Sequence, residues 1–286
     1  MTSGRYPAFV KGMNELGYVE GKDVVIEARY GDGNAARLAT LAAELVQSNV
    51  DVIVTGGTPA NRAAQKATKT IPIVLATSAN PVGEGYAATL ARPGGNVTGV
   101  TSNIADIEPK HLELLYDVVP KLSRVAVMWN PANSGHGYRV KALQAAALKL
   151  GMRTITVNAD TPRAIEEGFR VMVREGAQAV VILNDSFFVQ QERQITDLAL
   201  NHRLPSVCAL RSHPEAGGLM SYGPNTTDNF RRAASYVDKI LKGAKAGDLP
   251  IQQPTRFDLV INMRTARVLG LAIPKTMVFQ ADRVIE

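Results

Sequence analysis

The chain has 286 residues, 45% of them hydrophobic and 20% charged, which is longer than one compact domain usually needs. The formal net charge is +6 at pH 7, but basic residues are interspersed with acidic ones and the densest basic spot is only Arg231-Arg232, which argues against a nucleic-acid-binding surface. The single cysteine, Cys208, excludes an intramolecular disulfide and a multi-cysteine metal site.

The amino-terminal stretch MTSGRYPAF lacks the pattern of an export signal, because no basic segment is followed by an apolar one. No apolar run reaches the roughly 18 residues that a membrane span needs. We therefore expect a chain without a membrane span, and the sequence as written shows no export signal.

Short apolar runs rich in β-branched residues alternate with longer amphipathic segments rich in Ala and Leu, a pattern typical of parallel sheets joined by helices. In chain order, the predicted strands are 24–30, 50–56, 71–76, 97–101, 124–129, 154–157, 179–183, 206–209 and 219–221. The predicted helices are 7–16, 35–47, 59–68, 109–118, 137–150, 163–175, 189–202 and 229–241.

Gly17 and Gly151 each stand where a predicted helix ends, a position that favours glycine because its backbone becomes left-handed at little cost. The phrases NELGYVEGKDV and LKLGMRTITV share the order helix, glycine, strand, and one occurs in each half of the chain. We therefore predict an α/β fold of two similar lobes, each a doubly wound parallel sheet.

Ligands of doubly wound sheets bind where loops leave the carboxyl ends of the strands. Polar or glycine-rich turns follow four predicted strands: Gly56-Gly57-Thr58-Pro59-Ala60, Ser78-Ala79-Asn80-Pro81, Asn130-Pro131-Ala132-Asn133-Ser134 and Asn184-Asp185-Ser186-Phe187. We expect these turns to line a cleft rich in hydrogen-bond donors, with Asp185 as its one carboxylate.

This set of groups favours a zwitterion or a small polar acid as ligand. Thr58 can cap a helix, Pro59 suits its first turn, and the N–H groups of that turn would hold a carboxylate, although an ordinary helix start explains the same residues equally well. Asp185 would hold a cation, and Trp129, Phe187 or Tyr222 would contact an apolar body. A purely structural role for Trp129 is equally consistent with the sequence.

Enzyme motifs fit poorly. Residues 83–88, GEGYAA, satisfy a dinucleotide-binding pattern, but Asn80-Pro81-Val82 separates them from the preceding strand, where a true motif follows directly. Ser134-Gly135-His136 could suggest a nucleophile and a base, yet such close neighbours on one turn rarely orient each other. The four histidines are not at metal-ligand spacing, so we expect no catalysis, no cofactor and no metal site.

The chain also contains the phrases ELGYVEGKDVVIEARY, GGTPA, IPIVLATSANPVGEG, LARPGGNVTGVTS, RVAVMWNPANSG, GGLMSYGPN and PTRFDLVINMRTARVLGLAIP. In these phrases, which extend over nearly the whole chain, the sequence resembles the ABC-transporter substrate-binding proteins with a type I periplasmic-binding fold, a group that includes TrpX-like aromatic amino-acid binders. The resemblance implies a solute-binding component of an ABC importer, which closes on a small organic carboxylate, delivers it to permease subunits and catalyses nothing.

The resemblance further implies a ligand held between two lobes joined by a three-segment hinge, with lobe one at 1–101 plus 224–252 and lobe two at 102–223 plus 253–286. At the ligand's carboxylate, the resemblance places Thr58, Pro59 and Ala60, together with Asn133 or Ser134. It places Asp185 at the ligand's amino group and Ala79, Asn80 and Pro81 in the wall of the site. Gly217 and Gly218 would lie where the chain returns toward lobe one.

Members of the family usually carry an export signal and a first strand ahead of the helix that begins near Pro7. We therefore expect lobe one to lack its first strand, and the resemblance implies a periplasmic location.

Two other classes of protein stay open. One is a cytosolic α/β enzyme, such as a racemase or lyase, that acts on a small carboxylate. The other is the ligand-sensing module of a transcription regulator, although the sequence contains no helix-turn-helix segment.

Overall fold

The computed structural model describes residues 4–286, which divide into two compact units. Unit 1 comprises residues 4–103 with Asn225–Thr255, and unit 2 comprises Ile104–Pro224 with Arg256–Glu286. The chain therefore passes from one unit to the other three times. Each unit is a parallel or mostly parallel sheet covered by helices, so the predicted α/β fold class is confirmed.

Unit 1 is built on a three-stranded parallel sheet in the order β1 (Ile53–Gly56), β2 (Ile73–Thr77), β3 (Val97–Gly99). Successive side chains of a strand point to opposite faces, and every residue of β2 is buried. Burial on both faces explains why this strand reads as an unbroken apolar run instead of an alternating one.

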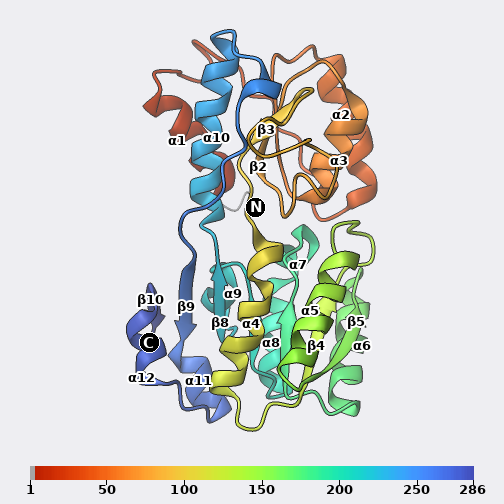
Figure 1. The fold of residues 1–286 in the computed structure, drawn as a ribbon, viewed down its shortest axis with the longest axis vertical. Helices are drawn as coiled ribbons and strands as arrows, with labels where there is room; N and C mark the ends of the chain where they lie inside the picture. The colour runs from red at the N-terminus through yellow and green to blue at the C-terminus, as the bar shows by residue number, and fades with distance from the viewer. Residues whose placement is uncertain (1–3) are drawn as a thin grey trace. The chain divides into compact units, whose positions relative to one another are not determined.

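Helices cover both faces of the unit 1 sheet (Figure 1). Val74 and Ala76 pack against α1 (Arg5–Glu15) and α10 (Thr226–Leu241). Ile73 and Leu75 face the other way, where the core includes residues of α2 (Leu38–Gln47) and α3 (Thr58–Ala67). Two short 3-10 turns complete the unit, η1 (Ala35–Arg37) and η2 (Ala246–Asp248).

The strand expected at 24–30 is not formed, and that prediction was wrong. The one ladder contact of this segment is an isolated bridge between Glu20 and Val24, and Val25 is 83% exposed. An extended segment becomes a strand only where another strand accepts and donates its backbone hydrogen bonds, and among the described residues none lies beside it. The apolar, β-branched pattern alone therefore overstated this element.

Unit 2 contains a seven-stranded sheet in the order β10-β9-β8-β7-β6-β4-β5, parallel except where β8 meets β9. Its strands are β4 (Arg124–Trp129), β5 (Arg153–Asn158), β6 (Ala179–Ile182), β7 (Ser206–Cys208), β8 (Met220–Gly223), β9 (Asp258–Asn262) and β10 (Arg283–Ile285). The sequence reading identified the first five but missed β9 and β10 at the end of the chain.

Alternate residues of β4 enter two separate cores. Val125 and Val127 pack with α4 (Ile104–Val118) and α5 (Gly137–Lys149), whereas Ala126 and Met128 pack with α6 (Pro162–Arg174) and α8 (Glu192–Asn201). The unit 2 sheet is therefore doubly wound. The short helices are α7 (Ser186–Gln190), α9 (Ser212–Glu215), α11 (Met263–Leu269) and α12 (Lys275–Gln280).

The predicted helices agree with the observed ones except in three places. The helix expected at 35–47 begins with the 3-10 turn η1, and its α-helical part is α2. The helix expected at 109–118 begins at Ile104, with Pro109 inside its first turns, so the proline did not mark its start. The helix expected at 189–202 is split into α7 and α8, which meet at Gln191. No helix within residues 4–286 combines the length and the apolar character that a membrane crossing requires.

Gly12 sets how closely α1 and α10 pack. A Cβ atom added at this position would lie 2.3 Å from the carbonyl oxygen of Arg231 and 2.9 Å from the Cβ of Ala234. Neither neighbour can rotate away, because one is backbone and the other is the first atom of its side chain. Glycine is therefore required here by packing and not by backbone conformation.

We predict that Gly12→Ala lowers the free energy of unfolding by about 1–3 kcal/mol, the usual cost of overpacking, measured by urea denaturation. The matched control is Gly137→Ala, another helical glycine, where an added Cβ meets nothing within 4 Å. Equal stability of the Gly12→Ala variant and the wild type would show that α1 and α10 are not packed this tightly.

Candidate functional site

The carboxyl ends of β1 and β2 carry a buried polar cluster in unit 1. Helix α3 starts directly after β1, and Gly57 allows this abrupt turn with a φ of 91°. Thr58 is the first helical residue, and the first-turn amides of Thr58 and Ala60 have no intrahelical acceptor because that acceptor would precede the helix. Pro59 has no N–H to satisfy, so its place in this turn is favourable.

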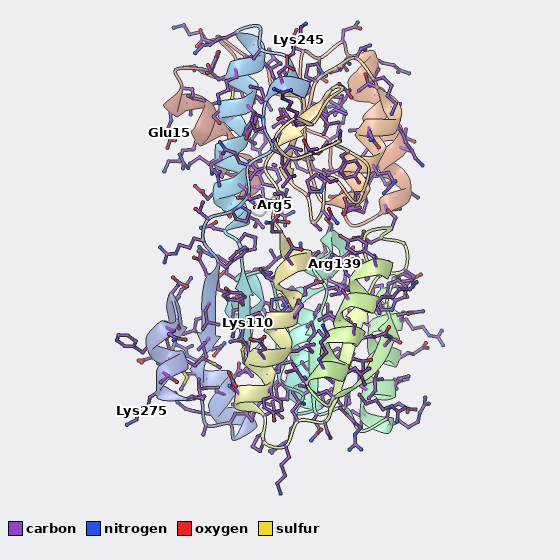
Figure 2. The ribbon with its side chains drawn as sticks, viewed as in Figure 1. Arg5, Glu15, Lys110, Arg139, Lys245 and Lys275 are labelled. Carbon is purple, nitrogen blue, oxygen red and sulfur yellow. The ribbon has the colours of Figure 1, made fainter. Side chains whose placement is uncertain are left out.

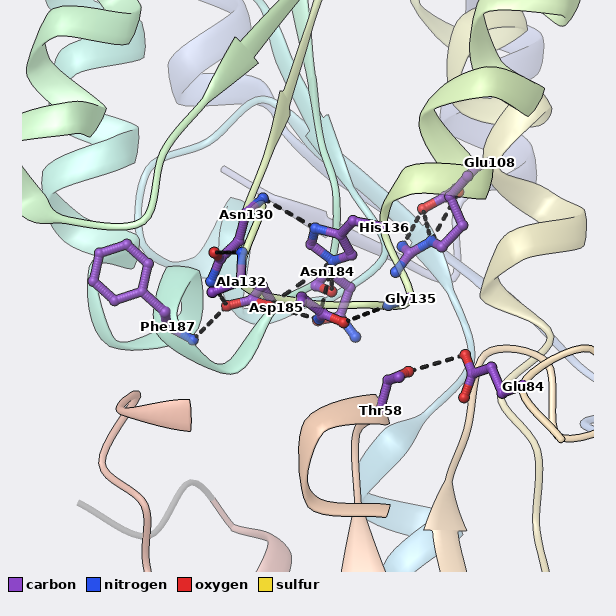
Figure 3. A network of polar contacts seen from close by, with 12 residues as sticks. Thr58, Glu84, Glu108, Asn130, Ala132, Gly135, His136, Asn184, Asp185 and Phe187 are labelled. Atoms are coloured by element: carbon purple, nitrogen blue, oxygen red, sulfur yellow. Dashed lines mark hydrogen bonds and ion pairs between the residues drawn. The ribbon is translucent and has the colours of Figure 1, made fainter. Parts of the chain in front are cut away.

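Glu84 lies beside this helix start, which the sequence reading did not anticipate. The Thr58 hydroxyl donates to Glu84 Oε1 at 3.0 Å (Figure 3). The Ser78 hydroxyl donates to Glu84 Oε2 at 3.5 Å. Glu84 is only 9% exposed, and the positive end of the α3 dipole favours a negative charge there. The expectation that Asp185 is the one carboxylate among the strand-end loops was therefore wrong.

Ala79 and Asn80 follow β2 in the same cluster and are half-buried. The Asn80 side chain turns back on its own loop, where its Oδ1 accepts a hydrogen bond from the amide of Gly83 at 2.9 Å. This contact closes a tight turn that leads to Glu84. The unit 1 residues expected in the site, Thr58, Pro59, Ala60, Ala79 and Asn80, thus lie on neighbouring loops at one edge of the sheet.

Asp185 is the centre of the corresponding cluster in unit 2 (Figure 3). It caps α7, since its Oδ1 accepts the amide of Phe187 at 2.8 Å, and the same oxygen accepts Asn130 Nδ2 at 3.2 Å. Its Oδ2 accepts Asn133 Nδ2 at 2.7 Å. The residue is 6% exposed, and three N–H donors compensate the burial of its charge.

The loop from Asn130 to Asn133 is held by its own side chains. Asn130 Oδ1 accepts the amide of Ala132 at 2.9 Å, and Asn133 Oδ1 accepts the amide of Gly135 at 3.0 Å. These bonds fix which way each amide group faces, so both Nδ2 groups point to Asp185. Asn133 and Asp185 are therefore brought together as expected from the sequence.

His136 connects this loop to the one that carries Asp185. Its Nδ1 accepts the backbone amide of Asn130 at 3.0 Å, and its Nε2 lies 3.1 Å from the carbonyl oxygen of Asn184. Burial and the positive charge of Arg139 lower the pKa of His136 to about 4, although Asp185 opposes them. Arg139 in turn forms a buried, bidentate ion pair with Glu108.

Two aromatic residues expected at the ligand lie in different cores. Trp129 packs partly buried on the α4 and α5 face of the sheet, and its Nε1 has no hydrogen-bond partner among residues 4–286. Phe187 is 9% exposed and packs on the α6 and α8 face. The structure therefore does not bring these rings together. Ser134 is exposed on the loop between Asn133 and His136.

Gly217 and Gly218 lie away from the cluster, because they precede β8 and so stand at the amino end of a strand parallel to β7. A Cβ added at Gly218 would be 2.2 Å from the ring of His213, which is buried and lies 2.8 Å from the Ser206 hydroxyl. Gly218 is therefore required by packing, whereas Gly217 has a left-handed backbone with a φ of 116°. We do not include either glycine in the proposed site.

Burial lowers the pKa of His213 to about 4. The unfolded chain, with an ordinary histidine pKa near 6.5, binds this proton first, so stability is lost as the pH falls from about 6.5 toward 4. We predict that His213→Gln reduces the loss of unfolding free energy between pH 7 and pH 4.5 by about 2–3 kcal/mol, measured by urea denaturation at both values.

His202→Gln, at an exposed histidine, is the control and should reproduce the wild-type difference. An unchanged pH dependence in His213→Gln would mean that His213 is not held neutral.

Sequence reasoning missed Glu84 and His136 as partners of the expected residues. Glu84 was considered only as a variable position in a dinucleotide motif, and His136 only as a base for Ser134. The one available signal was the position of each residue a few places after a strand-end turn, which many surface loops share.

The family model described as ABC transporter substrate binding protein matches residues 4–285. The "Tyrosine-binding protein" of Clostridioides difficile is 24% identical over 263 residues, which cover 92% of this chain and 75% of that protein. This chain belongs to the ABC transporter substrate binding protein family, so the resemblance noted in its sequence is confirmed.

Two solved structures are similar over almost the whole chain. The ABC domain in complex with L-Trp from Streptococcus pneumonia has a TM-score of 0.91 at 26% identity, covering 99% of this chain and 94% of that one. A conserved domain protein from Vibrio cholerae has a TM-score of 0.92 at 28% identity, covering 98% and 94%.

Proposed function

We propose that this protein is the solute-binding component of an ABC importer and that its ligand is an amino acid, with aromatic amino acids as the first candidates. The proposal depends on one observation: at the carboxyl end of β6, the buried carboxylate of Asp185 accepts hydrogen bonds from three N–H donors. The relatives named for tyrosine and solved with L-Trp support the aromatic class.

Asp185 has capacity for one further donor. A carboxylate offers about four lone-pair sites, and Oδ1 uses two of them while Oδ2 uses one. In our proposal, the ammonium group of the ligand donates to Oδ2. The bond would be charge-assisted, and such bonds contribute roughly 1.5–3 kcal/mol each.

The ligand's carboxylate would bind the amides of the first turn of α3, at Thr58 and Ala60, because a helix start combines N–H donors with a positive dipole end. Asn133 or Ser134 would contribute a second contact. Pro59, Ala79 and Asn80 would form wall contacts, and Trp129, whose indole N–H is buried, is the candidate for the apolar body.

Because these groups belong to both units, we propose that the ligand shifts an equilibrium between open and closed arrangements by contacting the two units at once. We propose that the closed protein then delivers its ligand, on the periplasmic side, to permease subunits at the membrane. We propose that the three chain segments at the lobe boundaries expected from the resemblance form the hinge of this movement.

The geometry of His136 and Asp185 supports binding without catalysis. His136 Nε2 lies 3.9 Å from Asp185 Oδ2, but both ring nitrogens are already within hydrogen-bond distance of backbone groups. A general base needs a lone pair that can reach the substrate proton, and the one lone pair of this ring accepts the amide of Asn130. We therefore propose that no reaction accompanies binding.

We predict that L-Trp or L-Tyr raises the Tm of the protein and binds without product formation, measured by thermal shift, calorimetry and product analysis. Asp185→Asn, which keeps the helix cap, should weaken binding of the amino acid at least tenfold because the ammonium loses its anionic partner. Binding of the matching deaminated acid, indole-3-propionate, should weaken by a smaller factor, because this ligand has no ammonium group and is affected only through Asn133, whose Nδ2 loses its acceptor.

The control variant is Asp117→Asn, an exposed aspartate on α4. Equal losses for the amino acid and the deaminated acid in Asp185→Asn would remove the ammonium contact, and conversion of either compound would overturn the binding-only function.

A further inference from the structure

The ring of His136 is constrained by partners whose roles are not interchangeable. The backbone N–H of Asn130 can only donate, so Nδ1, 3.0 Å away, must be an unprotonated acceptor. The carbonyl oxygen of Asn184 can only accept, so Nε2, 3.1 Å away, must carry the proton. Both contacts are to the backbone and define the neutral tautomer with its proton on Nε2.

The nearby amide of Asn133 agrees with this assignment. Its Oδ1 accepts the amide of Gly135, which leaves Nδ2 facing both Asp185 Oδ2 at 2.7 Å and His136 Nε2 at 3.2 Å. Since Nε2–H and Nδ2–H₂ are both donors, the Asn133 amide bonds to Asp185 and not to the ring. The contact with Asp185 is also the shorter of the two.

A second proton on the ring would break this arrangement. It would have to be on Nδ1, where it would face the N–H of Asn130, and that amide would lose its acceptor. The charged groups around the ring are Asp185 on the loop before α7, Arg139 on α5 and, paired with Arg139, Glu108 on α4. Burial and Arg139 oppose the extra charge, and Asp185 favours it.

We propose that His136 is a positioning residue: as the neutral Nε2–H tautomer it ties the Asn130–Asn133 loop to the Asn184–Asp185 loop, and ligand binding depends on its staying uncharged. The dependence of ligand binding on His136 rests on the function proposed above. The tautomer of His136 and its effect on the loop do not rest on that function, because they concern contacts within unit 2 alone.

The first test is long-range ¹H–¹⁵N NMR on the full chain with ¹⁵N-labelled histidine. We expect the His136 ring to be neutral with its proton on Nε2 from pH 7.5 to pH 5.5. A charged ring, or a proton on Nδ1, within that range overturns the proposal whether or not the protein binds any amino acid.

The second test is hydrogen exchange of the Asn130 amide and affinity for L-Trp and L-Tyr in His136→Ala at pH 7.5. We expect exchange to accelerate at least tenfold and the affinity for whichever amino acid the wild type binds to fall at least tenfold. His213→Ala is the matched control, since that histidine is also buried and has a similarly lowered pKa but lies outside this network. It should leave both readouts within twofold of the wild type.

His136→Gln should recover part of the loss, because a side-chain amide can accept the Asn130 N–H. Wild-type exchange and affinity in a folded His136→Ala variant would overturn the proposal. If that variant does not fold, the pH dependence of ligand binding by the wild type tests the proposal instead.

The pH profile is measured as the Kd of the wild type from pH 7.5 to pH 5.5. We expect a constant Kd within twofold, because the ring stays neutral over this range. A Kd that rises about fourfold or more by pH 6, as for a histidine with an ordinary pKa near 6.5, would contradict the proposal. If no amino acid binds, the proposed function fails, while NMR and exchange still decide the role of His136.

Discussion

Burying a carboxylate is unfavourable unless N–H and O–H groups replace the water that it has lost. Asp185 meets this condition with the amide of Phe187 and the side chains of Asn130 and Asn133. Each of these donors is itself oriented, the first by the start of α7 and the other two by bonds within their own loop. The unit 2 cluster is therefore preorganised around the Asp185 carboxylate (Figure 3). Arg139, labelled in Figure 2, is occupied by its ion pair with Glu108.

Unit 1 contains a related arrangement in which Glu84 lies beside the start of α3 and accepts hydroxyl groups from Thr58 and Ser78. In both units, helices pack on both faces of the sheet, so the central strands such as β2 and β6 are apolar and polar side chains collect on the loops at their carboxyl ends. This constraint explains how proteins with the same fold can bind different ligands when their loop residues change and their sheets stay the same.

The sequence predicted the fold well wherever apolar runs were long and bounded by turn residues, as at β2 and β4. It failed at residues 24–30, because a pattern of β-branched residues cannot report whether another strand lies alongside. It also missed β9 and β10, which close the far edge of the unit 2 sheet. For the candidate site, the strand ends pointed to Thr58, Asn133 and Asp185, which the structure places in buried polar clusters. The parts of Glu84 and His136 in these clusters depend on contacts between residues far apart in the chain, which sequence patterns do not show.

The central claim is that the loop clusters of the two units hold one amino acid together. Amide hydrogen exchange with and without saturating L-Trp or L-Tyr tests it most directly, because each backbone segment reports separately. The account predicts slower exchange both at residues 57–61 and 78–84 and at residues 130–136 and 184–187. Protection confined to one unit, or no protection at any of these loops while the ligand binds, would contradict it.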